Sequence, residues 1–287
     1  MDKDTLFALL ENSGSLPMLP QSVSEILAML KNPLDTDLDA LVERVSRNEP
    51  LNELMLRNLN SGYYQLGKKL TSVREAVVYL GMHAVQNLTI FFISRLLFPD
   101  AQRIRQNRTF DMPRYWRHVI GTSAAASMLA SRAHRGDGHK YFTYGLIHDI
   151  GIALLDACLP DLIDEVAVRV SNGIHQLAAE RALMGGLSHA EAGAWLCRRW
   201  NLREDITAIV ERHHAPFIAG PDAAEVRLIH VADTISTIYY ERLLGMNDAR
   251  AVSPHILSLA GVSEADAQAV ADALPQEVER IHSYFIT

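Results

Sequence analysis

Four polar residues stand in apolar helical surroundings, where a side chain without a partner would be unfavourable. His148 and Asp149 lie in the middle of the apolar run YGLIHDIGIALLD at 144–156, and Asp233 and His118 lie on apolar faces of two other predicted helices. An unpaired buried carboxylate costs several kcal/mol, so each aspartate needs a partner or a proton. Two imidazoles and two carboxylates can hold a divalent transition metal such as Mn, Fe, Ni or Zn.

Three further histidines extend this set of candidate ligands. Ser188 and Glu191 form a predicted capping box, which places His189 in the first turn of its helix. His213 continues an apolar stripe at helical spacing and therefore points toward the core, and His214 follows it at the helix end. These three histidines add further polar side chains that need partners.

The alternative to a metal site is a hydrogen-bonded core network in which Asp149 and Asp233 pair with histidines. A single histidine on an apolar face is more often such a core residue than a ligand. Gly145 and Gly151, which flank the His-Asp pair, are expected to allow close helix packing. Spacing alone leaves the metal site and the core network equally open.

Helical periodicity dominates the chain, and no run alternates in the manner of a strand. We therefore expect an all-α protein in which a helical N-terminal subdomain, residues 1–105, packs on a second helical subdomain, residues 106–287. The predicted boundary is the polar segment 99–114, which contains two prolines. The helices expected after it are 115–133, 142–155, 161–171, 188–200, 204–213, 224–244, 253–259, 263–274 and 277–285.

Composition restricts the class of partner and the compartment. The formal net charge of -7 makes nucleic acid an unlikely partner, and the basic segment RIRQNR at 103–108 is expected to be a solvated linker. The most apolar stretch, residues 88–94, is far shorter than a membrane span. Cys158 and Cys197 fit a reducing compartment and are expected to be buried free thiols. The sequence predicts a cytoplasmic protein without a membrane partner.

The order of the four polar residues resembles a known pattern. His118, the pair His148 and Asp149, and the distant Asp233 match the HD superfamily of helical metal-dependent phosphohydrolases. The segments LPMLPQSVSEILAMLKNP, NEPLNELMLRNLNSGYY and TSVREAVVYLGMHAVQNL resemble the N-terminal part of the HDOD family. SHAEAGAWLCRRWNL and VERHHAP are also similar to HDOD proteins, so the resemblance covers about residues 15 to 240.

The resemblance implies a bacterial signal-transduction protein that acts through signalling protein partners, with a nucleotide or cyclic dinucleotide as a further candidate ligand. HDOD proteins have no generally established enzymatic activity. His189, His213 and His214 match the second-metal ligands of the related HD-GYP cyclic-di-GMP phosphodiesterases. The resemblance implies that Asp149 would bridge the two ions.

Three departures from the HD-GYP pattern bear on catalysis. Ile152 replaces the lysine that usually follows the HDIG motif, and APFIAGP at 215–221 replaces the GYP signature. Arg114 stands where those enzymes often supply a further carboxylate ligand. We therefore expect a regulatory HDOD protein with a retained metal site. The alternative is a metal-dependent phosphohydrolase or cyclic-dinucleotide phosphodiesterase.

Overall fold

The computed structural model describes residues 2–16, 19–30, 37–60, 68–97, 108–136, 138–243 and 251–285. Within these ranges the protein is all-α and contains no strand, which confirms the expected fold class. The first helices are α1 (Lys3–Asn12), α2 (Gln21–Leu30), α3 (Leu38–Arg47), α4 (Glu49–Leu59), α5 (Val73–Leu80) and α6 (Met82–Leu97). The helices that follow are α7 (Met112–Arg132), α8 (Gly138–Ile147), α9 (Ile150–Cys158), α10 (Pro160–Ser171), α11 (Gln176–Leu183), α12 (His189–Arg199), α13 (Glu204–Arg212), α14 (Ala223–Leu243), α15 (Pro254–Ala260) and α16 (Glu264–Phe285).

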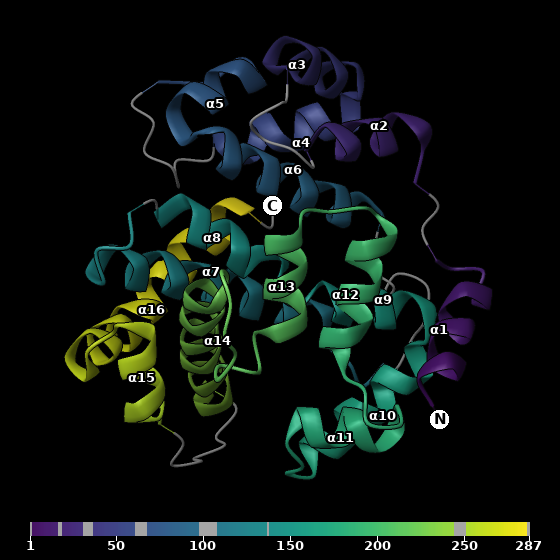
Figure 1. Ribbon diagram of the computed structural model, residues 1–287, viewed down its shortest axis with the longest axis vertical. Helices are drawn as coiled ribbons and strands as arrows, with labels where there is room; N and C mark the ends of the chain where they lie inside the picture. Colours follow the sequence, from purple (N-terminus) through teal and green to yellow (C-terminus); the bar gives the residue numbers. More distant parts are fainter. Residues whose placement is uncertain are drawn as a thin grey trace.

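Helices α2 to α6 form a bundle at one end of the molecule, and α7 to α14 lie below it in Figure 1. Helix α1 is apart from that bundle and contacts α9 instead. The Phe7 ring stacks on the Trp195 ring of α12 with centroids 5.5 Å apart, and Arg199 Nη1 lies 3.0 Å from Glu11 Oε1. The division into residues 1–105 and 106–287 stays a prediction, because residues 99–107, more than half of the expected boundary, lie outside the described residues.

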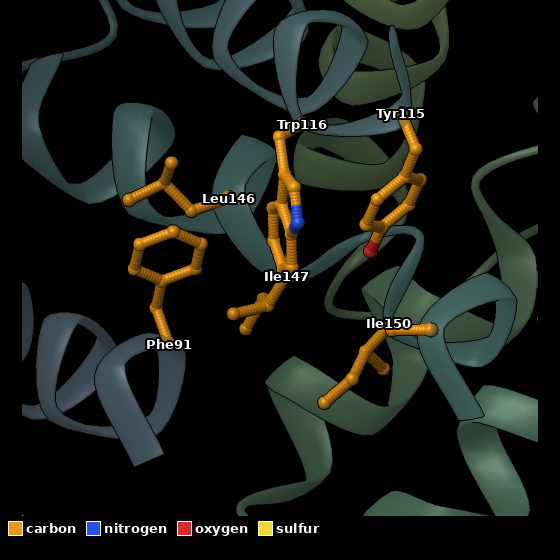
Figure 2. Close-up of a pocket in the computed structure, with 7 residues that line it drawn as sticks. Phe91, Tyr115, Trp116, Leu146, Ile147 and Ile150 are labelled. Carbon is orange, nitrogen blue, oxygen red and sulfur yellow. The ribbon is translucent and has the colours of Figure 1, made fainter. Parts of the chain in front are cut away.

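An apolar interface joins the α2–α6 bundle to the helices below it. Phe91 of α6 meets the Trp116 ring of α7 edge-on, with centroids 5.9 Å apart and an interplanar angle of 83°. Figure 2 shows Trp116 between Leu146 and Tyr115, in a small apolar pocket that Ile150 also lines. All five side chains are buried within one continuous hydrophobic core.

The segment expected to be one helix at 142–155 is two helices. Helix α8 ends at Ile147 and α9 begins at Ile150, so His148 and Asp149 form a turn between them. Asp149 has φ -101° and ψ 19°, outside the helical range, and its carbonyl accepts a hydrogen bond from the Tyr115 hydroxyl at 3.1 Å. Periodicity could not reveal the break, because nearly all residues of both helices are buried and no face of the segment is polar.

The C-terminal segment and two short helices also differ from expectation. The predicted pair 263–274 and 277–285 is one helix, α16, which continues through Pro275. Leu274 and Val278, on either side of this proline, are both buried, so packing along one face holds the helix together despite the hydrogen bond that proline removes. Helices α1 and α11 were not predicted.

Other sequence-based expectations agree with the structure. Cys158 and Cys197 are buried free thiols. The capping box of α12 is present, with both Ser188 and Glu191 making the expected backbone hydrogen bonds. Across the ranges that the structure describes, no helix has the length and apolar character needed to cross a membrane.

Arg108 contradicts the expectation of a solvated linker at 103–108, of which the other residues lie outside the described ranges. Its side chain is only 6% exposed. Its Nη2 lies 2.6 Å from Oδ1 of the buried Asp156, and its Nε lies 2.7 Å from Asp164 Oδ2. The backbone N–H groups of Thr109 and Phe110 also donate to Asp164. These bonds attach the start of α7 to α9 and α10.

We predict that Arg108→Ala lowers the free energy of unfolding by about 3 kcal/mol, because it leaves Asp156 buried without its guanidinium partner. Urea denaturation followed by circular dichroism measures the loss. The control is Arg198→Ala, which removes a more exposed ion pair with Glu211 and should cost less than about 1 kcal/mol. Equal losses in the two variants would show that the Arg108 pair contributes no more than a surface contact.

Candidate metal centre

The structure brings all seven predicted site residues together. Helix α7 supplies one, the α8–α9 turn two, the start of α12 one, the end of α13 two and α14 one. Their potential ligand atoms form two groups, each within 4.8 Å: Asp149, His189, His213 and His214 in one, and His118, His148 and Asp233 in the other.

The carboxylate of Asp149 lies between the two groups. Its Oδ2 is 3.4 Å from His118 Nε2 and 3.3 Å from His148 Nε2. Its Oδ1 is 3.1 Å from His189 Nε2 and 3.3 Å from His213 Nε2. One carboxylate therefore faces both groups, each with a different oxygen.

Asp233 also has close contacts with both groups. Its Oδ1 is 3.2 Å from His118 Nε2 and 3.9 Å from His148 Nε2. Its Oδ2 is 3.5 Å from His214 Nδ1. Thr237, one turn further along α14, donates its hydroxyl to Asp233 Oδ1 at 3.3 Å and orients this carboxylate.

Backbone carbonyls orient two of the imidazole rings. His148 Nδ1 lies 2.7 Å from the Gly145 carbonyl, and His213 Nδ1 lies 2.9 Å from the Val210 carbonyl. Because a carbonyl only accepts, Nδ1 carries a proton in both rings, and Nε2 is directed at the centre. Ring orientation of this kind is typical of histidines that bind metal.

Glu180 is a buried contact of the centre that sequence reasoning missed. It lies on α11, and its Oε2 accepts from His189 Nδ1 at 2.7 Å. No local pattern marks it, because its partner is nine residues away on another helix. Tyr115, whose hydroxyl donates to the Asp149 carbonyl, was missed for the same reason.

The buried charges of the centre shift one another's ionisation. Burial disfavours protonated His118, but the carboxylates of Asp149 and Asp233 outweigh it and raise the pKa of His118 to about 9. Burial likewise opposes ionisation of Asp149, yet His148 and His189 hold its pKa well below the usual range. The pKa of Asp233 is lowered too, since His118 outweighs the effect of burial. Positive charge beside them therefore stabilises the ionised form of both carboxylates.

Two buried atoms indicate that a cation fits this space. His148 Nε2 and Asp149 Oδ1 have polar atoms 3.1–3.3 Å away, but neither makes a well-aligned hydrogen bond among the described residues. An unsatisfied buried polar atom costs about 1–3 kcal/mol. Divalent ions held by the two groups would give both atoms a partner. A set of imidazole and carboxylate donors suits Mn, Fe, Ni or Zn. The residues present therefore fit a metal centre.

Two side chains of the centre are partly exposed to solvent. The side chains of His148 and His213 are completely buried, whereas His118 is 17% and His214 is 21% exposed. His118 and His214 are therefore the members of the centre most accessible to solvent.

Two glycines allow the helices to approach closely enough to assemble the centre, as expected. A Cβ at Gly151 would lie 1.9 Å from the His189 carbonyl oxygen and 2.7 Å from the Gly193 nitrogen. A Cβ at Gly145 would lie 2.5 Å from Ser123 Cα. Because both obstacles are backbone, side-chain rotation cannot relieve either clash. Gly151 thus sets the distance between α9 and α12.

A protein-family model, described as the HDOD domain, matches residues 16–216. A curated protein of Treponema pallidum (strain Nichols), described as uncharacterized, is 26% identical over 211 residues, which are 72% of this chain. The matched region spans only 39% of that relative's length.

Solved structures with the same fold come from several bacteria. An HDOD domain protein of unknown function from Geobacter sulfurreducens is 22% identical, with a TM-score of 0.72 and coverage of 99% of both chains. A protein from Marinobacter aquaeolei VT8, described as a candidate for signal transduction, is 21% identical with a TM-score of 0.74, over 98% of this chain and 64% of that chain. A candidate phosphohydrolase from Shewanella amazonensis SB2B is 24% identical with a TM-score of 0.70, over 96% and 98% of the two chains.

We predict that Gly151→Ala lowers the free energy of unfolding by about 2 kcal/mol, because the added methyl group forces α9 and α12 apart. Chemical denaturation provides the measurement. Gly138→Ala is the matched control: its Cβ would meet the hydroxyls of Ser127 and Ser131 at 3.0 and 3.4 Å, and both can rotate away. A Gly151→Ala protein as stable as the control would refute a packing role for this glycine.

Proposed function

We propose that this chain, which belongs to the HDOD family, is a bacterial regulatory protein that binds divalent metal and acts through protein contacts. The observation that carries the proposal is the position of Asp149, whose two oxygens face two separate groups of potential ligands. A carboxylate in this position suits two neighbouring ions better than a core network, because a complete network would give His148 Nε2 and Asp149 Oδ1 well-aligned hydrogen bonds, which the close ring nitrogens and carboxylate oxygens do not provide.

The proposed ligands are the seven residues of the centre. The first ion would be held by His118, His148, Asp149 and Asp233, and the second by His189, His213 and His214 together with Asp149. We propose Mn, Fe, Ni or Zn as the metal, because nitrogen and oxygen donors in this proportion suit those ions.

A chain of packed residues supports a route from the centre to the α2–α6 bundle. The Tyr115 hydroxyl bonds to the Asp149 carbonyl, and its ring packs on Trp116 with centroids 4.7 Å apart. Trp116 in turn contacts Phe91 of α6 across the apolar interface. A shift of the Asp149 backbone on metal binding would press directly on this chain of residues. We propose that the bundle, the core of the predicted subdomain 1–105, presents the resulting change to a protein.

The proposed partner is a signalling protein rather than nucleic acid. A formal net charge of -7 opposes approach to a polyanionic backbone. A small anionic ligand, a nucleotide or cyclic dinucleotide, could still reach bound metal past the partly exposed side chains of His118 and His214.

Metal-dependent hydrolysis of a phosphate ester or cyclic dinucleotide is the second candidate function. The same observation favours it, because two adjacent metal sites sharing a carboxylate can activate a water and hold phosphate oxygens. Two features make it the weaker candidate. Ile152 is buried where the HD-GYP pattern has a lysine, and the 215–221 segment lacks the signature of those enzymes.

We predict that protein purified without chelator or an immobilised-metal column contains close to two equivalents of metal, and that Asp149→Ala contains almost none, because it removes the shared carboxylate. Elemental analysis makes the measurement, with circular dichroism to establish that the variant is folded. Asp161→Ala, which removes an exposed carboxylate on α10, is the control and should bind metal normally. Full metal content in folded Asp149→Ala would refute the proposed site.

We also predict that metal added to chelated protein slows amide hydrogen exchange in α6 as well as in helices beside the centre, and that Asp149→Ala abolishes both effects. Hydrogen exchange resolved by mass spectrometry would detect this. Protection confined to α9, α12 and α13 would disprove the route to the bundle. Turnover of a cyclic dinucleotide on the order of 1 per second would instead favour the hydrolase.

A further inference from the structure

Glu180 is a fully buried carboxylate outside the seven proposed ligands. Both of its oxygens face His189 Nδ1, at 2.9 Å for Oε1 and 2.7 Å for Oε2. The backbone N–H of His189 donates to Oε2 at 3.0 Å, and Gln176 Nε2 donates to Oε1 at 2.8 Å. A carboxylate without exposure to water needs such bonds, and His189 provides most of them.

We propose that Glu180 is a positioning residue that makes the group of Asp149, His189, His213 and His214 a strong metal site. This inference rests on the proposed function, since it concerns how the same centre binds its second ion. By holding Nδ1–H, Glu180 directs His189 Nε2 toward the centre, where it lies 3.1 Å from Asp149 Oδ1. A carboxylate behind an imidazole also makes the metal-binding nitrogen more basic.

The two groups of potential ligands differ in the number of carboxylates that they offer to a cation. The group of His118 and His148 has its own carboxylate, Asp233, in addition to the shared Asp149. The other group adds only imidazoles to Asp149, so it would hold a divalent cation with less negative charge. Glu180 supplies the missing carboxylate immediately behind one of these imidazoles.

A comparison of His189 with the other imidazole rings shows what Glu180 contributes. His148 and His213 donate from Nδ1 to neutral backbone carbonyls, which orient the ring but carry no net charge. His189 donates instead to the carboxylate of Glu180, at 2.7 Å from Oε2, and this partner carries a full negative charge. The metal-binding strength of this group should therefore depend on Glu180 more than on any single carbonyl.

The packing of α11 places Glu180 for this role. Ala179 and Met184, on either side of Glu180 in the sequence, are buried and anchor the helix. Gln176, one turn earlier on α11, donates a neutral hydrogen bond to Glu180 Oε1. The position of α11 is thereby linked to the start of α12, where His189 lies.

The test is calorimetric titration of chelated protein with Mn²⁺, comparing wild type, Glu180→Gln and Gln176→Ala. Gln at position 180 keeps the size of the side chain but removes the charge. We expect wild type to bind two ions, and Glu180→Gln to bind one ion normally and the other 10- to 100-fold more weakly. Gln176→Ala keeps the carboxylate and should change either affinity by less than about threefold.

The outcomes separate this inference from the proposed function. If wild type binds no Mn²⁺, both are overturned. If wild type and folded Glu180→Gln bind two ions equally well, only the role of Glu180 is overturned. Should Glu180→Gln not fold, Glu180→Asp keeps the charge at a greater distance and should weaken one ion selectively; unchanged affinities, or equal loss at both sites, would overturn the inference.

Discussion

The candidate metal centre depends on the burial of one carboxylate, that of Asp149, among four imidazole rings. Its two oxygens lie within 3.1–3.4 Å of ring nitrogens from α7, the α8–α9 turn, α12 and the end of α13. So much polarity is stable in an all-α core only if opposite charge accompanies it, from protonated histidine or from metal. The helices that surround Asp149 are therefore also the helices whose packing is sensitive to what the centre holds.

The turn between α8 and α9 links the candidate metal centre to the apolar interface with α6. It directs the side chain of Asp149 into the centre. The Asp149 carbonyl accepts a hydrogen bond from the Tyr115 hydroxyl, beside the aromatic interface with α6. Gly151, just after the turn, lets α9 touch the backbone of α12 at His189. One short segment thus contacts both groups of ligands and is connected to the α2–α6 bundle through Tyr115 and Trp116, which is why we favour a regulatory role for the metal over a purely hydrolytic one.

The supports behind the ligands make the centre asymmetric. Neutral carbonyls orient His148 and His213, whereas Glu180 places a carboxylate behind His189. Metal affinity follows charge as well as geometry, so the two proposed ions need not bind alike. A centre with unequal affinities could be partly occupied over a range of metal concentrations, a property useful to a sensor.

Local patterns in the sequence predicted the helical class and the packing role of Gly145 and Gly151, because periodicity and residue type report which face of a helix is buried. The seven candidate ligands needed the family resemblance as well, since spacing alone left a metal site and a core network equally open. Only tertiary structure decided the break at His148 and Asp149, since a wholly apolar segment looks the same whether it is one helix or two. It also decided the burial of Arg108 and Glu180. Their partners come from other helices. Residue spacing along the chain cannot predict an ion pair that forms only when those helices pack.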